Sequence, residues 1–409
     1  MVFDYLLIGG GLASASAAET LRKEGAGGTI AIISDEELYP YHRPPLSKNF
    51  LIKNLKSEDI IVYDESFYKN NNIDVLLGTK VLTLCPQRKM VETDNQGSIR
   101  YGKLLIATGS RVKKLNVPGS NLRGIYYLRN ISDAESIQRA TSYSKKAVVV
   151  GSGFIGMELA SVFAQMGIRT TIISRGKNLL ARLGSREISN FFENYYKNKG
   201  VDIISGDTVK EFQGTRHVNR IVTERGKTIS CDIVAVGIGV VPETAFLESS
   251  GVSLDNGIIV DKSMQTNFQE IYAAGDVTRF YDPLFRAHRR VEHWDNAVKQ
   301  GKIASKNMLG KKDYYNEVSY FFSDVFDLSF DFLGYSSNTD ERIVNGSIAD
   351  KSFSVYYLKS GILRAGFLLN RSSSEADAVR DLIRNRVNVG KNKSRLASLK
   401  IPTEKVIAQ

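Results

Sequence analysis

Hydrophobic residues in this chain form short runs that end in glycine, and two of these runs continue into stretches rich in small residues. Residues 5–19 read YLLIGGGLASASAAE, and residues 147–160 read AVVVGSGFIGMELA. Each pattern predicts an apolar strand, a glycine turn and the start of a helix. The two copies lie 142 residues apart, which is too long for a solenoid repeat. The spacing therefore indicates two copies of one domain type.

Other apolar runs extend this alternation of strands and helices. AIIS (31–34), LLIATGS (104–110), TTIIS (170–174) and DIVAVGIG (232–239) are typical of buried strands, and IYAAGDV (271–277) predicts one more. The spacing of residues 291–310 predicts a helix. Strands that alternate with helices indicate doubly wound parallel sheets. The predicted fold class is α/β, with two Rossmann-like domains.

The pattern changes after residue 312, where aromatic residues crowd in YYNEVSYFFSDVFDLSFDFLGY. SFSVYYL and GILRAGFLL then predict antiparallel strands, and EADAVRDLIRNR predicts a helix. Together they indicate a C-terminal α+β domain. The last 20 or so residues carry Lys391, Lys393, Arg395 and Lys400, and we expect a basic, loosely held tail.

Composition narrows the class of protein. The 409 residues are 42% hydrophobic and 24% charged, which excludes disorder as the main state. No segment has the length of a membrane span, and the apolar start lacks the basic region of a signal peptide. With only two cysteines, a disulfide framework is excluded, so we expect a cytoplasmic protein. The net charge of +11 favours an acidic partner, although a solvated basic surface without a partner stays open.

The two glycine turns have the spacing of phosphate cradles. Gly9 and Gly11 allow a tight turn and close approach to a pyrophosphate, while Ser14 replaces the third glycine of the fingerprint. The second turn has all three glycines, Gly151, Gly153 and Gly156. The following helix N-termini offer free N–H groups to phosphates. One such turn is weak evidence of a site, and glycines that serve packing alone are the alternative, but two copies strongly indicate two dinucleotide sites.

Two dinucleotide sites in one chain predict one bound and one exchanging cofactor, with hydride transfer between nicotinamide and flavin. Asp35 follows the second strand and is placed to accept hydrogen bonds from ribose hydroxyls. At the corresponding place in the second copy, Ser174 is followed by Arg175-Gly176-Lys177, without an acid. Because Arg binds phosphate oxygens well, we expect NADPH in preference to NADH, or use of both. Solvated loop charges are the alternative.

Six motifs in order resemble the FAD-dependent pyridine nucleotide oxidoreductases. They are YPYHRPPLSK (39–48), LLIATGS, GSGFIGMELA (151–160), AVGIGVVPE (235–243), IYAAGDV and RRVEHWDNAVKQG (289–301). The first motif is similar to the ferredoxin/rubredoxin reductase branch, which includes oxygenase-coupled ferredoxin reductases, apoptosis-inducing factor and monodehydroascorbate reductase. The resemblance implies a glutathione-reductase-like fold. It has an FAD domain in two parts, 1–112 and 242–312, an NAD(P)H domain at 113–241, and a C-terminal domain at 313–409.

The resemblance also implies which residues hold the cofactors. It places Arg43 and Lys48 by the flavin, the backbone of Val81 at the adenine, and Asp276 on the ribityl chain. It implies an ion pair between Lys48, near flavin N5, and Glu158. Without the resemblance, the default interpretation of these residues is two unrelated surface charges. The remaining cofactor-site candidates are Leu12, Ala107, Thr108, Gly109, Phe154, Ile155, Gly237, Gly275, Glu292, His293 and Trp294.

Trp294 is the only tryptophan of the chain. We interpret its ring as a cover for the flavin edge or the nicotinamide pocket, and a core aromatic is the alternative. The disulfide reductases of this superfamily carry a cysteine pair beside the flavin, close in sequence to the first glycine turn. Here that stretch reads HRPPLSKNF and has no cysteine. Cys85 and Cys231 lie in or near apolar strands and are expected to be buried, inert thiols. Electrons must therefore leave the flavin directly.

The expected activity is NAD(P)H-dependent reduction of noncovalently bound FAD, with electrons passing to an acidic ferredoxin or rubredoxin. A small acceptor (quinone, monodehydroascorbate or dioxygen) stays open, as does a slow redox sensor resembling apoptosis-inducing factor. Scattered Lys and Arg do not form a nucleic-acid module, and four histidines without a ligand cluster indicate no metal site. We expect a monomer or a homodimer.

Overall fold

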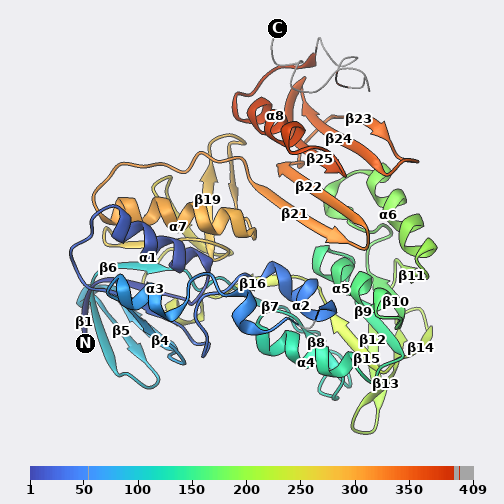
Figure 1. Ribbon diagram of the computed structural model, residues 1–409, viewed down its shortest axis with the longest axis horizontal. Coiled ribbons are helices and arrows are strands. Elements are labelled where there is room, and N and C mark those ends of the chain that lie inside the picture. The colour runs from blue at the N-terminus through green and yellow to red at the C-terminus, as the bar shows by residue number, and fades with distance from the viewer. Residues whose placement is uncertain (54, 391–395, 397–409) are drawn as a thin grey trace. The chain divides into compact units, whose positions relative to one another are not determined.

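The computed structural model describes residues 1–53, 55–390 and 396, so the charged residues of the predicted basic tail lie outside the described residues. The chain divides into two compact units, each made from separate stretches of sequence (Figure 1). The first unit contains Met1–Arg43, Ser57–Arg111 and Val241–Tyr320. The second contains Pro44–Lys56, Val112–Val240 and the described residues from Phe321 onward. The three domain boundaries expected from the sequence stay a prediction.

A seven-stranded sheet forms the centre of the first unit. Its order is β3-β2-β1-β6-β5-β4, with β18 paired to β6. The bounds are β1 Val2–Ile8, β2 Ile30–Ile33, β3 Ile73–Leu76, β4 Val81–Cys85, β5 Met90–Thr93, β6 Ser98–Ile106 and β18 Ile271–Ala273. Strands β3, β2, β1, β6 and β18 are parallel, while β4 and β5 are antiparallel additions. All four residues of β2 are buried, as expected for a parallel strand covered on both faces.

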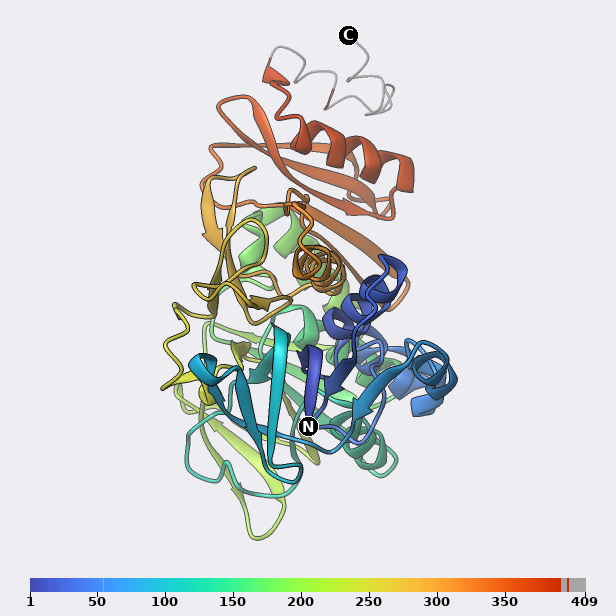
Figure 2. The same cartoon turned by 90° about the vertical axis from the view of Figure 1, so that its left-hand side faces the viewer.

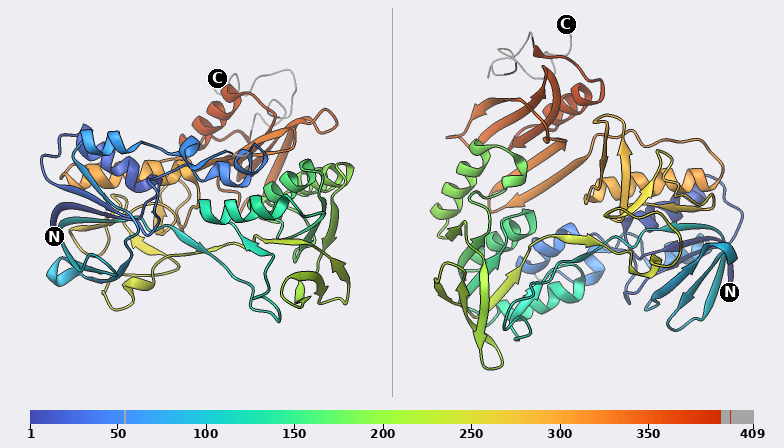
Figure 3. Two further views of the ribbon diagram at one scale, coloured as in Figure 1. Left: turned by 60° about the horizontal axis from the view of Figure 1, so that its bottom comes forward. Right: turned by 180° about the vertical axis from the view of Figure 1, so that it is seen from behind.

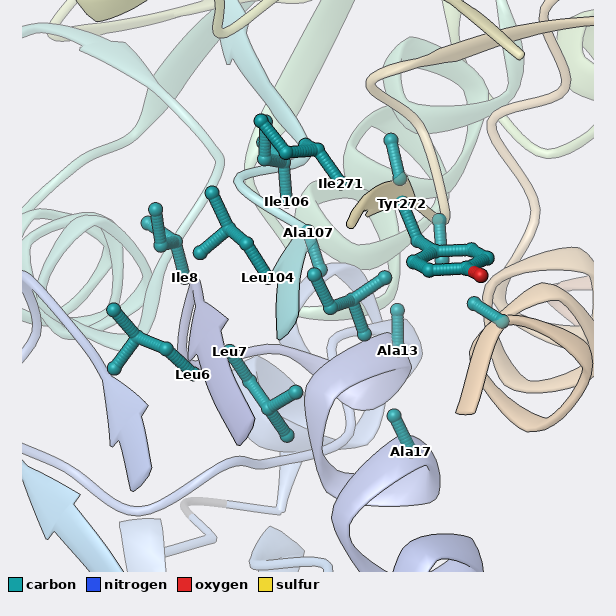
Figure 4. Close-up of a cluster of buried hydrophobic side chains, with 14 of the residues drawn as sticks. Leu6, Leu7, Ile8, Ala13, Ala17, Leu104, Ile106, Ala107, Ile271 and Tyr272 are labelled. Carbon is teal, nitrogen blue, oxygen red and sulfur yellow. The ribbon is translucent and has the colours of Figure 1, made fainter. Parts of the chain in front are cut away.

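Two helices packed closely together cover this sheet, α1 (Leu12–Lys23) and α7 (Trp294–Met308). Their close approach depends on small residues, because a Cβ on Gly301 would lie 2.3 Å from the carbonyl oxygen of Ala13. Figure 4 shows Ala13 and Ala17 of α1 among the buried side chains of the sheet. The tight packing fixes the N-terminal ends of both helices relative to the strand ends.

The rest of the first unit is made of short elements. The three-stranded sheet has the order β17-β19-β20, with β17 Ile258–Val260, β19 Thr278–Asp282 and β20 Ala287–Arg289. The helical segments are α3 Glu65–Asn70 and the 3₁₀ turns Ser57–Ile60, Pro86–Arg88 and Ala245–Leu247. Strands β7 (Ser110–Val112) and β16 (Val240–Pro242) pair where the chain passes between the two units.

The second unit repeats the Rossmann pattern with a five-stranded parallel sheet (Figure 3). Its order is β11-β10-β9-β15-β8. The bounds are β8 Ile125–Tyr127, β9 Lys146–Val150, β10 Arg169–Ser174, β11 Asp202–Ser205 and β15 Ile233–Val236. The helices are α2 Asn49–Ile52, α4 Ile131–Thr141, α5 Phe154–Gln165 and α6 Arg186–Asn198, with 3₁₀ turns at Pro44–Ser47 and Ala181–Leu183. An antiparallel sheet of β12 Val209–Gly214, β13 Val218–Thr223 and β14 Thr228–Ser230 follows β11.

The C-terminal part of the second unit is the expected α+β fold. Its sheet has the order β21-β22-β25-β24-β23, and helix α8 (Ser373–Arg384) lies along it (Figure 2). The bounds are β21 Tyr320–Val325, β22 Leu328–Gly334, β23 Glu341–Ser347, β24 Ser352–Lys359 and β25 Ile362–Leu369. The ring of Phe154 on α5 lies 4.4 Å from Phe321, and Phe192 on α6 lies 5.4 Å from Phe330. These aromatic contacts join the C-terminal sheet to the helices of the Rossmann domain.

Candidate functional site

The two glycine turns have the same construction. Gly9 has a φ of +115°, and a Cβ there would lie 2.3 Å from the carbonyl oxygen of Ala107, just beyond β6. Gly151 has a φ of +119°, and its Cβ would lie 2.2 Å from the carbonyl oxygen of Gly237, just beyond β15. Only glycine fits either position. The first glycine thus lets each turn pass close under the end of the neighbouring strand, as the sequence predicted.

The space in front of each helix is open. Gly11 and Gly153 are the N-cap residues of α1 and α5, and neither has a side chain that caps the helix. A Cβ on either glycine would meet nothing within 4 Å. The first N–H groups of these 12-residue helices are therefore available to an anion, and the helix dipoles favour one. Both turns fit the pyrophosphate of a dinucleotide.

The third positions of the two turns differ. A Cβ on Gly156 would lie 2.2 Å from the carbonyl oxygen of Gly151, so the second turn tolerates glycine alone. Ser14 occupies the corresponding place in the first unit and is fully buried. Leu12 and Phe154 begin the two helices, and Ile155 is 43% exposed beside the second turn.

Asp35 lies at the place expected for a ribose ligand. It is exposed directly after Ser34, which follows β2. The neighbouring carboxylate of Glu36 is engaged differently, because its Oε1 lies 2.7 Å from a guanidinium nitrogen of Arg43. The Tyr41 hydroxyl also donates to Glu36, at 2.6 Å. Asp35 is thus presented to solvent, while Arg43 is held by Glu36.

A second group of candidates lies at the ends of β6 and β18. Asp276 follows Gly275 and accepts a hydrogen bond from the Ser110 hydroxyl at 2.9 Å. The Gly275 N–H donates to Oε1 of Gln300, also at 2.9 Å, so α7 holds this turn. The Thr108 hydroxyl donates to a backbone carbonyl at 2.8 Å. Ala107, which is buried, and Gly109, which has a φ of +68°, also lie here. The fold therefore brings these residues together with the first glycine turn. Val81 is buried at the start of β4, elsewhere in the same sheet.

Glu292, His293 and Trp294 lead into helix α7. Glu292 pairs with Arg290, with an Oε1–Nη1 distance of 2.6 Å. Desolvation, with the nearby Arg289 charge, lowers the pKa of His293 to about 4, so its imidazole is neutral at pH 7. Trp294 is 37% exposed at the first position of the helix. The alternative of a core tryptophan is therefore wrong.

Lys48 and Glu158 form the predicted ion pair within the second unit. Their Nζ–Oε1 distance is 3.4 Å, and the exposed fractions of their side chains are 13% and 6%. The alternative of two unrelated surface charges is therefore wrong. Burial raises the pKa of Glu158, and the Lys48 charge and hydroxyl donors act against this. A position beside the flavin stays a prediction.

The sequence analysis missed the residues that surround this pair. The hydroxyls of Ser47 and Ser323 each donate to one carboxylate oxygen of Glu158. Asp324 Oδ2 lies 3.3 Å from Lys48 Nζ, and the ammonium also lies 4.7 Å from the centroid of the Phe322 ring. Three of these four residues come from β21, which the sequence placed in the C-terminal domain. The only signal in the sequence was the pair Ser323-Asp324, two polar residues that interrupt the apolar run YFFSDV.

The residues predicted to bind the coenzyme ribose lie at the end of β10 and in the loop after it. The Ser174 hydroxyl is buried and lies 2.7 Å from that of Ser152 in the glycine turn. It also donates to the Gly176 carbonyl at 3.1 Å. Ser174 thus links the loop to the turn, while Arg175 and Lys177 are exposed. The loop presents positive charge and, from 174 to 178, no carboxylate.

The two cysteines differ from each other. Cys231 is buried, and burial raises the pKa of its thiol to about 12, as expected for an inert thiol. Cys85 is half-buried at the end of β4, so the prediction of a buried thiol is wrong for this residue. The strand ends there and its last side chain faces partly outward. Among the described residues, none of the helices has both the length and the hydropathy needed to cross a bilayer.

Comparison with known proteins agrees with this geometry. Residues 3–301 match the model of the pyridine nucleotide-disulphide oxidoreductase family, and residues 320–403 match the reductase C-terminal domain. The ferredoxin reductase subunit of 5,5′-dehydrodivanillate O-demethylase from Sphingobium sp. (strain NBRC 103272 / SYK-6) is 33% identical, over 99% of this chain and 98% of that protein. Peroxisomal monodehydroascorbate reductase 2 from Oryza sativa subsp. japonica is also 33% identical, over 95% and 86% of the two chains.

A solved structure shows the same fold over nearly the whole chain. The covalent putidaredoxin reductase–putidaredoxin complex matches with a TM-score of 0.95 and 30% identity, over 99% of this chain and 98% of that chain. FAD and NAD(P)H are therefore the cofactors of this chain, and the assignment of each glycine turn to one of them stays a prediction. The chain belongs to the pyridine nucleotide-disulphide oxidoreductase family, and it is an NAD(P)H-dependent flavoprotein oxidoreductase.

Proposed function

We propose that this protein oxidises NAD(P)H with a noncovalently bound FAD and delivers the electrons to a small acidic ferredoxin or rubredoxin. The observation that carries the proposal is the pair of glycine turns of the same construction, one in each unit, in a chain without a dithiol near the first turn. The bound flavin would supply hydride acceptance and one-electron donation. The ferredoxin reductase relative and the net charge of +11 support a small acidic redox protein as acceptor.

Each part of the chain has a defined task in this proposal. The N-terminus of α1 binds the FAD pyrophosphate, Asp35 accepts from the ribose hydroxyls, and Asp276 binds the ribityl chain. The N-terminus of α5 binds the coenzyme pyrophosphate. Lys48, held by Glu158, provides positive charge where reduction places negative charge on the flavin. Trp294 covers the ring or the nicotinamide pocket.

A small acceptor is the second candidate function. It is favoured by the similarity to a monodehydroascorbate reductase at the same identity as the ferredoxin reductase. Both functions share the reductive half of the cycle and differ in where the electrons go. A protein acceptor docks through a complementary charged surface, so the rate of its reduction falls steeply as ionic strength rises. The rate of reduction of a neutral quinone depends little on ionic strength.

Steady-state oxidation of NADPH and NADH against a panel of acceptors tests the proposal. The panel contains a ferredoxin, a rubredoxin, a quinone, the monodehydroascorbate radical and dioxygen, each at low and high salt. We expect the highest kcat/KM with a ferredoxin or rubredoxin, and loss of that rate at high salt. Preference for a small acceptor at both salt concentrations would establish the second function. Slow oxidation of both coenzymes with every acceptor in the panel would reject both functions.

A further inference from the structure

The ammonium of Lys48 lies between two carboxylates, at nearly the same distance from each. Its Nζ is 3.4 Å from Oε1 of Glu158 and 3.3 Å from Oδ2 of Asp324. Charged hydrogen bonds between an ammonium and a carboxylate are usually about 2.7–2.9 Å long. The cation is therefore shared between an inner and an outer anion. With three N–H donors, it can still donate to a third acceptor.

Glu158 does not depend on Lys48 alone. The hydroxyls of Ser47 and Ser323 donate to its two carboxylate oxygens, one each. A buried carboxylate with these two hydrogen bonds is partly stabilised before any cation approaches. Asp324 is therefore a second anion beside Lys48. Stabilising the buried carboxylate of Glu158 does not require it.

Asp324 is held in position by the hairpin that carries it. Along β21, Ser323 faces inward and Asp324 outward, and the exposed fraction of the Asp324 side chain is 49%. The Phe326 N–H at the hairpin turn donates to the Ser161 hydroxyl oxygen on α5, at 2.7 Å. This hydrogen bond ties the hairpin that carries Asp324 to α5, the helix that carries Glu158.

We propose that Asp324 is a positioning residue that offsets the charge of Lys48 and so lowers the midpoint potential of the bound FAD. The inference rests on the role of Lys48 in the proposed function. A cation beside the flavin favours its reduction, and a second anion on that cation weakens the effect. A flavin of lower potential is a stronger donor to a low-potential redox protein. Asp324 would therefore adjust the balance between accepting hydride and releasing electrons.

The test is a redox titration of the holoenzyme carrying Asp324→Asn, followed by the visible spectrum of the flavin. We expect the midpoint potential to rise by about 15–30 mV, because a tenfold change in a two-electron equilibrium corresponds to about 30 mV. Asp324→Glu, which keeps the charge, should retain the wild-type potential. Asp350→Asn removes an exposed carboxylate from the turn between β23 and β24 in the same domain and should leave the potential unchanged.

Lys48→Met completes a double-mutant cycle. In that background, Asp324→Asn should shift the potential by much less, because the half-exposed aspartate then faces solvent without a cation to hold it. An unchanged or lower potential in Asp324→Asn would overturn the inference, as would an equal shift in Asp350→Asn or an undiminished shift without Lys48. If Lys48→Met alone changes neither the potential nor the reduction rate, the role of Lys48 in the proposed function fails instead.

Discussion

At the scale of single residues, the most consequential contact joins two residues 110 positions apart in the sequence, Lys48 and Glu158. We expect Lys48→Ala to slow reduction of the flavin by NAD(P)H. The loss of a charged interaction is worth about 1–3 kcal/mol, or about 5- to 150-fold in rate. Glu158→Ala should also impair reduction, because Lys48 loses its inner anchor. Stopped-flow absorbance of the flavin measures both rates.

The control for this pair is Lys53→Ala, which removes an exposed lysine from the end of the neighbouring short helix α2. It should leave the rate of reduction unchanged. If Lys48→Ala and Glu158→Ala both reduce at the wild-type rate, the pair has no part in hydride acceptance.

Coenzyme choice is also decided by single residues. The loop after β10 presents Arg175 and Lys177 to solvent, without a carboxylate to repel a 2′-phosphate. We expect wild-type kcat/KM to be higher with NADPH than with NADH, or comparable for both. Arg175→Ala should lower the NADPH value by roughly tenfold, the scale of one charged hydrogen bond, and spare NADH. Arg169→Ala, at the other end of β10, is the matched control for charge. A strong wild-type preference for NADH, or an unchanged NADPH value in Arg175→Ala, contradicts this role.

At the scale of elements, each cofactor site consists of one strand, one glycine turn and one helix. Gly11 and Gly153 have negative φ values, and a Cβ on either meets open space. Gly11→Ala should therefore leave the fold intact but fill the approach to the FAD phosphates. Gly153→Ala should do the same for the coenzyme. We expect about 10- to 100-fold weaker binding of the affected cofactor only, the scale of one hydrogen bond to a charged group.

Isothermal titration of the apoprotein with FAD, and of the holoenzyme with NADP⁺ and NAD⁺, measures these affinities. Gly156→Ala is the contrasting variant, because its Cβ would lie 2.2 Å from a backbone oxygen. It should also lower the free energy of unfolding by about 1–3 kcal/mol, as overpacking does. Equal losses of both cofactors in Gly11→Ala would argue against two separate phosphate cradles.

At the scale of the whole molecule, FAD binding should contribute to folding stability without a covalent bond. A ligand that binds only the folded state adds about 2.7 kcal/mol at 100 times its Kd. We therefore expect the Tm of the apoprotein to rise with FAD concentration. Acid precipitation of the holoenzyme should release all of the flavin into the supernatant. Flavin retained in the precipitate would show a covalent link, and a protein that binds no FAD would reject the assignment.

The sequence by itself determined the architecture, because its signals are local. An apolar run such as Ile30–Ile33 predicts a parallel strand, and the spacing of Gly9 and Gly11 directly after such a run predicts a glycine turn. Both signals are read from residues a few positions apart. The antiparallel strands SFSVYYL and GILRAGFLL and the helix EADAVRDLIRNR are predicted in the same way, from short local runs of sequence.

Only the tertiary structure decided the surroundings of Lys48. Ser47, Glu158, Ser323 and Asp324 come from three distant stretches of the chain, and no period or spacing relates them. Likewise, nothing local distinguishes Cys85, half-buried at a strand end, from Cys231, buried in a core. Which side chains are buried, and which charged groups lie close together, depends on which segments pack against each other. The contacts of whole strands and helices, added together, determine that packing. The sequence therefore determined the two glycine turns, while the folded chain decided which charges meet around Lys48.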